Sequence, residues 1–144
     1  MIEQDTIRLL RECDAGAKMG IASIQDVMKH VQNGDLRRRL ADGKLEHQRL
    51  ETEIREQLDR FQDQGKDPGA VAQTMSRLTT EWKLTVRGAD STAAELVTDG
   101  CNMGVKSLSR YLNQYRAADE GSRETAEKLI RLEARMAEEM RSFL

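Results

Sequence analysis

Apolar residues recur at steps of three and four positions along nearly the whole of this 144-residue chain. That spacing puts them on one face of an α-helix, and no other regular structure has this period. The first series consists of Ile7, Leu10, Ala17, Ile21, Ile24, Met28 and Val31. Comparable series follow it, separated by short stretches rich in glycine, asparagine and aspartate, which favour turns. The sequence therefore predicts an all-helical protein.

The turn-forming stretches divide the chain into five predicted helices. The first two are separated by "NGD" at 33–35, and the second ends at "QGKDPG", where Pro68 suits the first turn of a further helix. That third helix carries Trp82, the only tryptophan. A chain of this length forms about one domain. We therefore expect a single domain over 1–144, composed of a helical hairpin over about 2–64, a crossover helix over about 68–87 and a second hairpin over about 90–144.

One phrase of the sequence occurs twice. "GAKMGIAS" begins at position 16 and "GCNMGVKS" begins at position 100, 84 residues later, with glycine, methionine, glycine and serine at the same spacing. Small residues at this spacing let neighbouring helices approach closely. We expect such helix contacts at Gly16, Gly20, Gly100 and Gly104. The same offset aligns the first predicted helix with the fourth and the second with the fifth, which predicts two copies of one helical hairpin.

The stretch "TDGCNMGVKSLSRYLNQY", residues 98–115, resembles the third bundle helix of an uncharacterised bacterial family of ferritin-like domains. Two hairpins joined by one long crossover are also the connectivity of ferritin-like bundles. The resemblance implies a ferritin-like four-helix bundle with a crossover that contains an extra helix. It also implies a place where many members of that superfamily bind two metal ions between the helices.

The ligands of such a di-metal site are not found at the expected spacing. The site takes a glutamate from each of two helices and a Glu-x-x-His pair from each of the other two. This chain has two histidines, His30 and His47, and neither follows a glutamate at that distance. Ala17 and Cys101 stand where inward carboxylates would be expected on the first and fourth helices. We therefore do not expect an ordinary di-iron centre.

Polar side chains on the otherwise apolar helix faces form a candidate site in the middle of the bundle. Its members are Asp14, His47, Thr98, Cys101 and Glu133. In one interpretation they satisfy one another in the core, with Asp14 paired to His47 or to Lys18. In a second, they hold a single zinc or iron ion, for which Asp, His and Cys are competent ligands. In a third, Cys101 is a reactive thiolate beside a cation such as His47 or Lys18.

Charge and composition exclude several classes of partner. The chain has 23 basic and 25 acidic residues, a net charge of −2, and no concentrated basic face of the kind that nucleic-acid binding requires. No apolar run approaches the roughly 20 residues that span a bilayer. The charged N-terminal stretch does not read as a signal peptide, and two cysteines indicate free thiols in a reducing compartment. We expect a cytoplasmic protein that binds neither nucleic acid nor membrane.

No catalytic motif with its required spacing occurs in the sequence. We therefore expect a non-enzymatic structural or interaction protein that needs no cofactor. Tyr111 and Tyr115, beside arginines on the fourth helix, favour self-association, and a dimer is the expected form. The alternative is a metal-binding oxidoreductase or iron-handling protein with an atypical mid-bundle site for iron or zinc.

Overall fold

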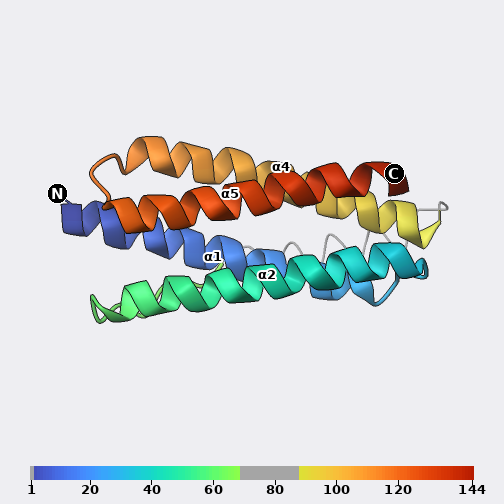
Figure 1. Cartoon of the computed structure of the whole chain (residues 1–144), viewed down its shortest axis with the longest axis horizontal. Coiled ribbons are helices and arrows are strands. Elements are labelled where there is room, and N and C mark those ends of the chain that lie inside the picture. The colour runs from blue at the N-terminus through green and yellow to red at the C-terminus, as the bar shows by residue number, and fades with distance from the viewer. Residues whose placement is uncertain (1, 69–87) are drawn as a thin grey trace.

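Four long helices make up the part of the protein that the computed structural model describes, which is residues 2–68 and 88–144 (Figure 1). They are α1 (Ile2–Met28), α2 (Gly34–Asp59), α4 (Ala89–Gln114) and α5 (Glu120–Met140), followed by the short 3-10 helix η1 (Arg141–Phe143). No strand occurs in these two ranges, which confirms the all-helical prediction. The helix predicted over 68–87, with Trp82, lies outside the described residues apart from Pro68.

Side-chain caps start two of the helices, at positions where the sequence breaks its helical pattern. The side chain of Asn33 accepts a hydrogen bond from the backbone N–H of Leu36 at 3.0 Å, and α2 begins directly after Asn33, at Gly34. Asp119 accepts from the N–H of Ser122 at 2.8 Å and starts α5 in the same way. Each cap satisfies a backbone donor that the first turn of a helix leaves without an intrahelical partner.

The helices pack as two antiparallel hairpins placed side by side. α1 packs against α2, and α4 against α5; α1 also contacts α4 and α5, and α2 contacts α5. α1 and α5 run in one direction and α2 and α4 in the other (Figure 1). α2 therefore ends at the opposite end of the bundle from the start of α4, and the chain between them has to cover its length.

One apolar core runs through the bundle and takes residues from all four long helices. Its fully buried members include Leu10, Ala17 and Val27 of α1 and Leu129 and Met140 of α5. The positions in α1 belong to the predicted apolar series or lie directly beside it. Burying a leucine, valine or methionine side chain contributes about 1.5–3 kcal/mol. The local period of the sequence is thus sufficient to identify most of the core.

Buried positions recur at a fixed offset in the two hairpins. Between α1 and α4 the offset is 84, for the buried pairs Leu9 and Ala93, Leu10 and Ala94, Cys13 and Val97, Ala17 and Cys101, and Ile24 and Leu108. Between α2 and α5 the offset is 86, since their N-cap residues Asn33 and Asp119 are 86 positions apart. The end of α4 also lies 86 residues after the end of α1. The offset therefore changes from 84 to 86 near the C-terminal ends of α1 and α4. At the predicted offset of 84, the N-cap Asp119 would instead align with Asp35, which lies inside α2.

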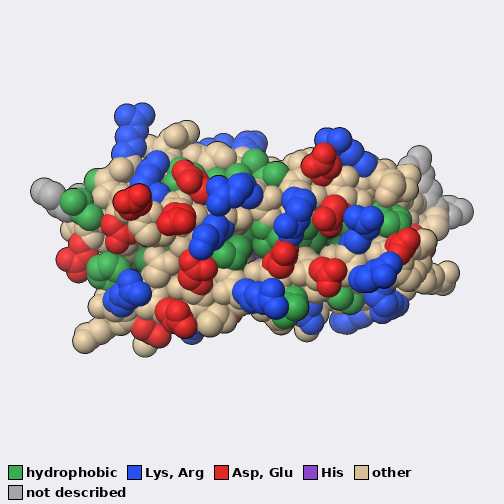
Figure 2. All heavy atoms as spheres, in the orientation of Figure 1, with side chains coloured by type: hydrophobic (Ala, Val, Ile, Leu, Met, Phe, Trp, Pro, Cys, Tyr) green, Lys and Arg blue, Asp and Glu red, His purple; other side chains and the backbone are tan. Residues whose placement is uncertain are grey.

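The surface of the bundle is mixed in charge. On the face shown in Figure 2, basic and acidic side chains are interspersed, with small apolar areas between them. The described helices contain no stretch that is both long and apolar enough to cross a membrane.

Candidate functional site

His47 of α2 and Glu133 of α5 face each other inside the bundle. His47 Nε2 lies 3.2 Å from Glu133 Oε1, and His47 Nδ1 lies 2.8 Å from the carbonyl oxygen of Gly43. The side chains are 1% and 8% exposed. The carbonyl oxygen can only accept, so Nδ1 carries a hydrogen. Nε2 and Oε1 would then both be acceptors unless a proton lies between them, so the pair holds one proton in the core.

The surroundings of His47 favour its protonated form. Burial by itself lowers the pKa of His47, but the hydrogen bond with Glu133 and the negative charge of Glu133 raise it. The carbonyl of Gly43 and the charge of Glu46 act in the same direction, and the net effect is a pKa above the ordinary histidine value. An imidazolium paired with a carboxylate is therefore the form that this site supports.

Glycines on the two facing helices make room for the pair. A Cβ at Gly20 of α1 would lie 2.7 Å from His47 Cδ2 and Nε2. A Cβ at Gly104 of α4 would lie 3.1 Å from the carboxyl carbon of Glu133. Gly20 and Gly104 are the same position of the two repeated phrases, and His47 and Glu133 are related by the offset of 86. Each hairpin thus supplies one glycine and one polar side chain.

The other two glycines of the repeated phrases do not make contacts this close. A Cβ at Gly16 would be at an ordinary contact distance, 3.8 Å, from Leu129. No atom of the described residues lies within 4 Å of a Cβ at Gly100, which is exposed. The expected close helix contact is therefore not found at Gly100 among the described residues; Gly100 instead borders open space between α1 and α4.

Cys101 adjoins the pair as a thiol. It is 5% exposed and lies close enough to Glu133 for that carboxyl group to raise the pKa of the thiol. Burial raises its pKa far above the ordinary thiol value, and the charge of Glu133 adds to the effect. Burial also raises the pKa of Cys13 to about 12. Both cysteines therefore stay protonated near neutral pH, which argues against the reactive-thiolate interpretation.

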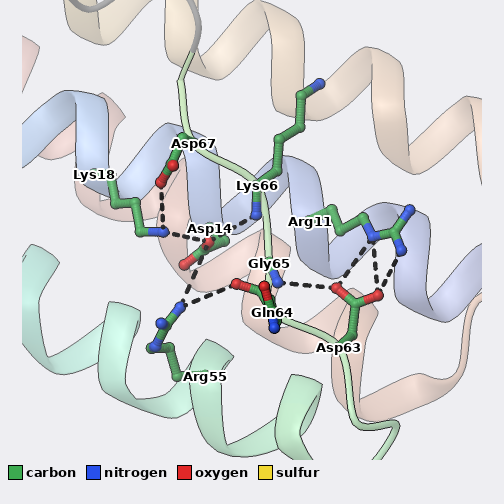
Figure 3. A network of polar contacts seen from close by, with 9 residues as sticks. All are labelled: Arg11, Asp14, Lys18, Arg55, Asp63, Gln64, Gly65, Lys66 and Asp67. Atoms are coloured by element: carbon green, nitrogen blue, oxygen red, sulfur yellow. Dashed lines mark hydrogen bonds and ion pairs between the residues drawn. The ribbon is translucent and has the colours of Figure 1, made fainter.

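Asp14 lies in a different network, which holds the chain segment after α2 on α1 (Figure 3). Its side chain is fully buried, and Oδ2 accepts hydrogen bonds from Lys18 Nζ at 2.8 Å and from the backbone N–H of Lys66 at 3.0 Å. Oδ1 has no hydrogen-bond partner among the described residues. Of the two partners expected for Asp14, Lys18 is found and His47 is not.

Further ion pairs fix the same segment. Asp63 receives three hydrogen bonds from Arg11, at 3.1, 3.1 and 2.5 Å, and Lys66 Nζ lies 2.7 Å from Glu12 Oε1. Gly65 adopts a φ of 81°, where a Cβ would overlap Asp14 Oδ2. The helical pattern alone does not reveal this role of Gly65, although a glycine within "QGKDPG" is a signal for positive φ.

The Thr98 hydroxyl is bonded neither to the His47–Glu133 pair nor to the network around Asp14. It donates to the carbonyl of Ala94 at 2.7 Å, within α4 itself. Three of the five candidate residues are therefore brought together: His47, Cys101 and Glu133. In residues 2–68 and 88–144, no three His, Cys, Asp or Glu side chains are arranged to hold a metal ion.

An apolar groove lies between α1 and α4, with the pair at its base. Its volume is about 380 Å³. It extends from Glu12 and Tyr111 at one end to Val27 and Leu96 at the other, and His47 and Glu133 are the lining residues that come from α2 and α5. We call this feature the α1–α4 groove.

Comparisons of the chain with protein-family models, curated proteins and solved structures gave no match. Its function is therefore inferred from the site itself.

Proposed function

We propose that this protein is a ferritin-like helical bundle that acts as a non-enzymatic structural or interaction protein. The observation that carries the proposal is the His47–Glu133 pair, whose members satisfy each other between the helices where ferritin-like bundles place metal ligands. The helix directions support the ferritin-like assignment, because the connection from α2 to α4 has to run the length of the bundle.

A duplicated hairpin is part of this proposal. Gly20 and Gly104 hold the same position in the two repeated phrases. Gly20 packs against His47, and Gly104 packs against Glu133. Matching burial at an offset of 84 in the first helices, and matching caps at 86 in the second, support descent from one hairpin.

The chemistry of the pair explains why we favour a non-enzymatic role. A general acid or base must reach a proton of its substrate, whereas His47 and Glu133 are hydrogen-bonded to each other and nearly inaccessible. The neighbouring thiol is held protonated. A buried polar pair of this kind fixes how the two hairpins sit against each other, which is a structural role.

One observation favours the alternative, a metal-binding protein. His47, Glu133 and Cys101 come from three helices and carry nitrogen, oxygen and sulfur, the atom types that bind zinc, although they would have to rearrange to hold an ion together. A metal ion would have to displace the proton shared by the pair and the proton of the thiol, so its affinity would rise steeply with pH.

Elemental analysis separates these two functions. The full chain would be purified without a tag, a chelator or a nickel column, and compared with His47→Gln and with the matched control His30→Gln. We expect no stoichiometric iron, zinc or manganese in any of the three proteins. About one metal ion per chain, lost in His47→Gln and retained in His30→Gln, would establish the alternative.

We also propose that the protein is a cytoplasmic dimer. Tyr111 and Tyr115 stack on each other with ring centroids 6.2 Å apart, and both are half-buried against the protein's own core. Exposed apolar side chains such as Leu45 and Met103 are therefore better candidates for the contact between copies. Sedimentation velocity over a range of concentrations tests this, and a strict monomer at high concentration would rule the dimer out.

A further inference from the structure

The turn of each hairpin lies beside the start of the first helix of the other hairpin (Figure 1). At one end of the bundle, the turn between α4 and α5 lies beside the beginning of α1. At the other end, the turn between α1 and α2 lies beside the beginning of α4. Both contacts are made by hydrogen bonds from backbone N–H groups of the turn to side chains of the helix start. The hairpins are therefore joined at both ends of the bundle as well as at the His47–Glu133 pair.

The turn after α1 is bonded to an aspartate of the second hairpin. Asp90, in the first turn of α4, accepts from the backbone N–H of Gln32 at 2.7 Å and from that of Asn33 at 3.2 Å. Asn33 is also the N-cap of α2, and its side chain accepts from the N–H of Leu36. One residue thus links the two helices, because its backbone is bonded to α4 while its side chain caps α2.

The turn after α4 is bonded to the first hairpin in the corresponding way. The hydroxyl oxygen of Thr6 accepts from the backbone N–H of Asp119 at 2.8 Å, and Asp5 accepts from that of Ala117 at 3.0 Å. Asp119 is the N-cap of α5, and its side chain accepts from the N–H of Ser122. The N-cap residues of α2 and α5 are therefore both held through their backbone by the other hairpin.

The helix starts that supply these acceptors are themselves fixed in the core. Thr6 is buried, and Leu9 and Leu10 follow it in α1 as fully buried residues. In α4, Thr92 and Ala93 are buried directly after Asp90. A helix start with buried side chains leaves its place only when packing in the core is broken. The positions of the acceptors therefore depend on the packing of the bundle and not on the turns that they hold.

The bonds act on the backbone conformation that capping requires. Asn33 has φ −66° and ψ 127°, and Asp119 has φ −66° and ψ 165°, which are extended and not helical conformations. An N-cap residue needs such a conformation for its side chain to reach the N–H three residues on. The N–H of the cap residue has no partner within its own helix. A bond from that N–H to the other hairpin therefore favours the capping conformation over the alternatives.

We propose that each hairpin holds the N-cap residue of the other hairpin's second helix in its capping conformation, so that the first turns of α2 and α5 are stable only while the hairpins are docked. The effect is reciprocal, because α4 acts on α2 through Asp90 and α1 acts on α5 through Thr6. A partner or condition that separates the hairpins then also loosens these two helix starts.

Hydrogen exchange of single amides, measured by NMR on the full chain, tests the action of α4 on α2. Asp90→Ala should speed exchange at Leu36 about tenfold or more, because a hydrogen bond to a charged acceptor is lost at Asn33. Leu36 is the informative amide, since its N–H donates to Asn33 and not to Asp90. The amides at the start of α5 should be unchanged. Glu95→Ala is the matched control: this exposed acid of α4 takes no part in the bonds to residues 32–33 and should leave Leu36 unchanged.

Thr6→Val tests the action of α1 on α5. It removes the hydroxyl that accepts from Asp119 but keeps a β-branched side chain of similar size. Exchange at Ser122 should become severalfold faster, while exchange at Leu36 stays the same. Thr6→Ser keeps the hydroxyl and should retain slow exchange at Ser122.

The urea dependence of exchange in the unaltered protein tests whether these helix starts depend on docking. Exchange at Leu36 and Ser122 should accelerate with urea with a slope near that of global unfolding, because the opening that exposes them includes separation of the hairpins. A slope near zero would mean local opening and would overturn the proposal. Unchanged exchange at Leu36 in Asp90→Ala would also overturn it. Equal acceleration at both helix starts in Asp90→Ala would do the same, since it would reflect a general loss of stability.

Discussion

His47 of α2 and Glu133 of α5 lie 3.2 Å apart and occupy the position that follows the N-cap by 14 residues in each helix. Each is faced by a glycine from the repeated phrase of its own hairpin. The two positions are thus alike in their distance from the N-cap but not in chemistry, because one hairpin presents a base and the other an acid. This complementarity joins the two hairpins.

The first prediction concerns pH. The folded-state pKa of His47 is above its unfolded value of about 6.5, so the stabilisation from the pair is fully present below about pH 6.5 and is lost as pH rises through the folded pKa. The difference in unfolding free energy between wild type and His47→Gln should therefore shrink as pH rises. Urea unfolding of both proteins at several pH values checks this. A difference that grows with pH would contradict the raised pKa.

The second prediction concerns the charge of Glu133. Glu133→Gln keeps a side chain that can hydrogen-bond His47 but removes the negative charge that raises its pKa. We expect the pKa of His47, measured by NMR titration, to fall in this variant. Glu133→Ala should cost about 1–3 kcal/mol, because it leaves a buried imidazole nitrogen without a partner. An unchanged pKa of His47 in Glu133→Gln would show that the pair does not control it.

The third prediction compares two glycines of the same phrase. Gly20→Ala places a Cβ 2.7 Å from the His47 ring, so we expect a loss of about 1–3 kcal/mol through overpacking. Gly16→Ala meets Leu129 at an ordinary 3.8 Å and should gain up to about 1 kcal/mol from helix propensity. Urea unfolding measures both. Equal effects of the two substitutions would mean that His47 can move away without cost.

The fourth prediction concerns the network around Asp14. Gly65→Ala should destabilise by about 1–3 kcal/mol, because alanine is strained at a φ of 81° and its Cβ would overlap Asp14 Oδ2. In an Asp14→Ala background the overlap is removed and only the backbone strain remains. Gly65→Ala should therefore cost less in the Asp14→Ala protein than in wild type. A double-mutant cycle measures the difference. Additive effects would place Gly65 outside contact with Asp14.

Much of the fold follows from local sequence patterns. The series that contains Ala17 and Ile24 identifies a buried helix face, and the break at Asn33 identifies a helix start. The same pattern predicts that His47 lies on a buried face, and its side chain is 1% exposed. These features are predictable because helix period and capping depend on residues a few positions apart.

The partners of the polar side chains were not predictable in the same way. Asp14 and His47 both lie on apolar faces, yet Asp14 is paired with Lys18 and the backbone of Lys66, and His47 with Glu133. Which groups meet depends on the rotation and stagger of packed helices. In the second hairpin, the register also changes by two residues near the end of α4.

The sequence by itself determined the helices, their buried faces, and the two glycine phrases that permit close approach. Only the tertiary structure decided that Glu133 meets His47 across 86 residues and that the segment after α2 is held on α1 at Asp14. The physical reason is range: helix formation and amphipathicity are set within a few turns of chain. A buried charge instead takes whichever partner the final packing brings within hydrogen-bonding distance.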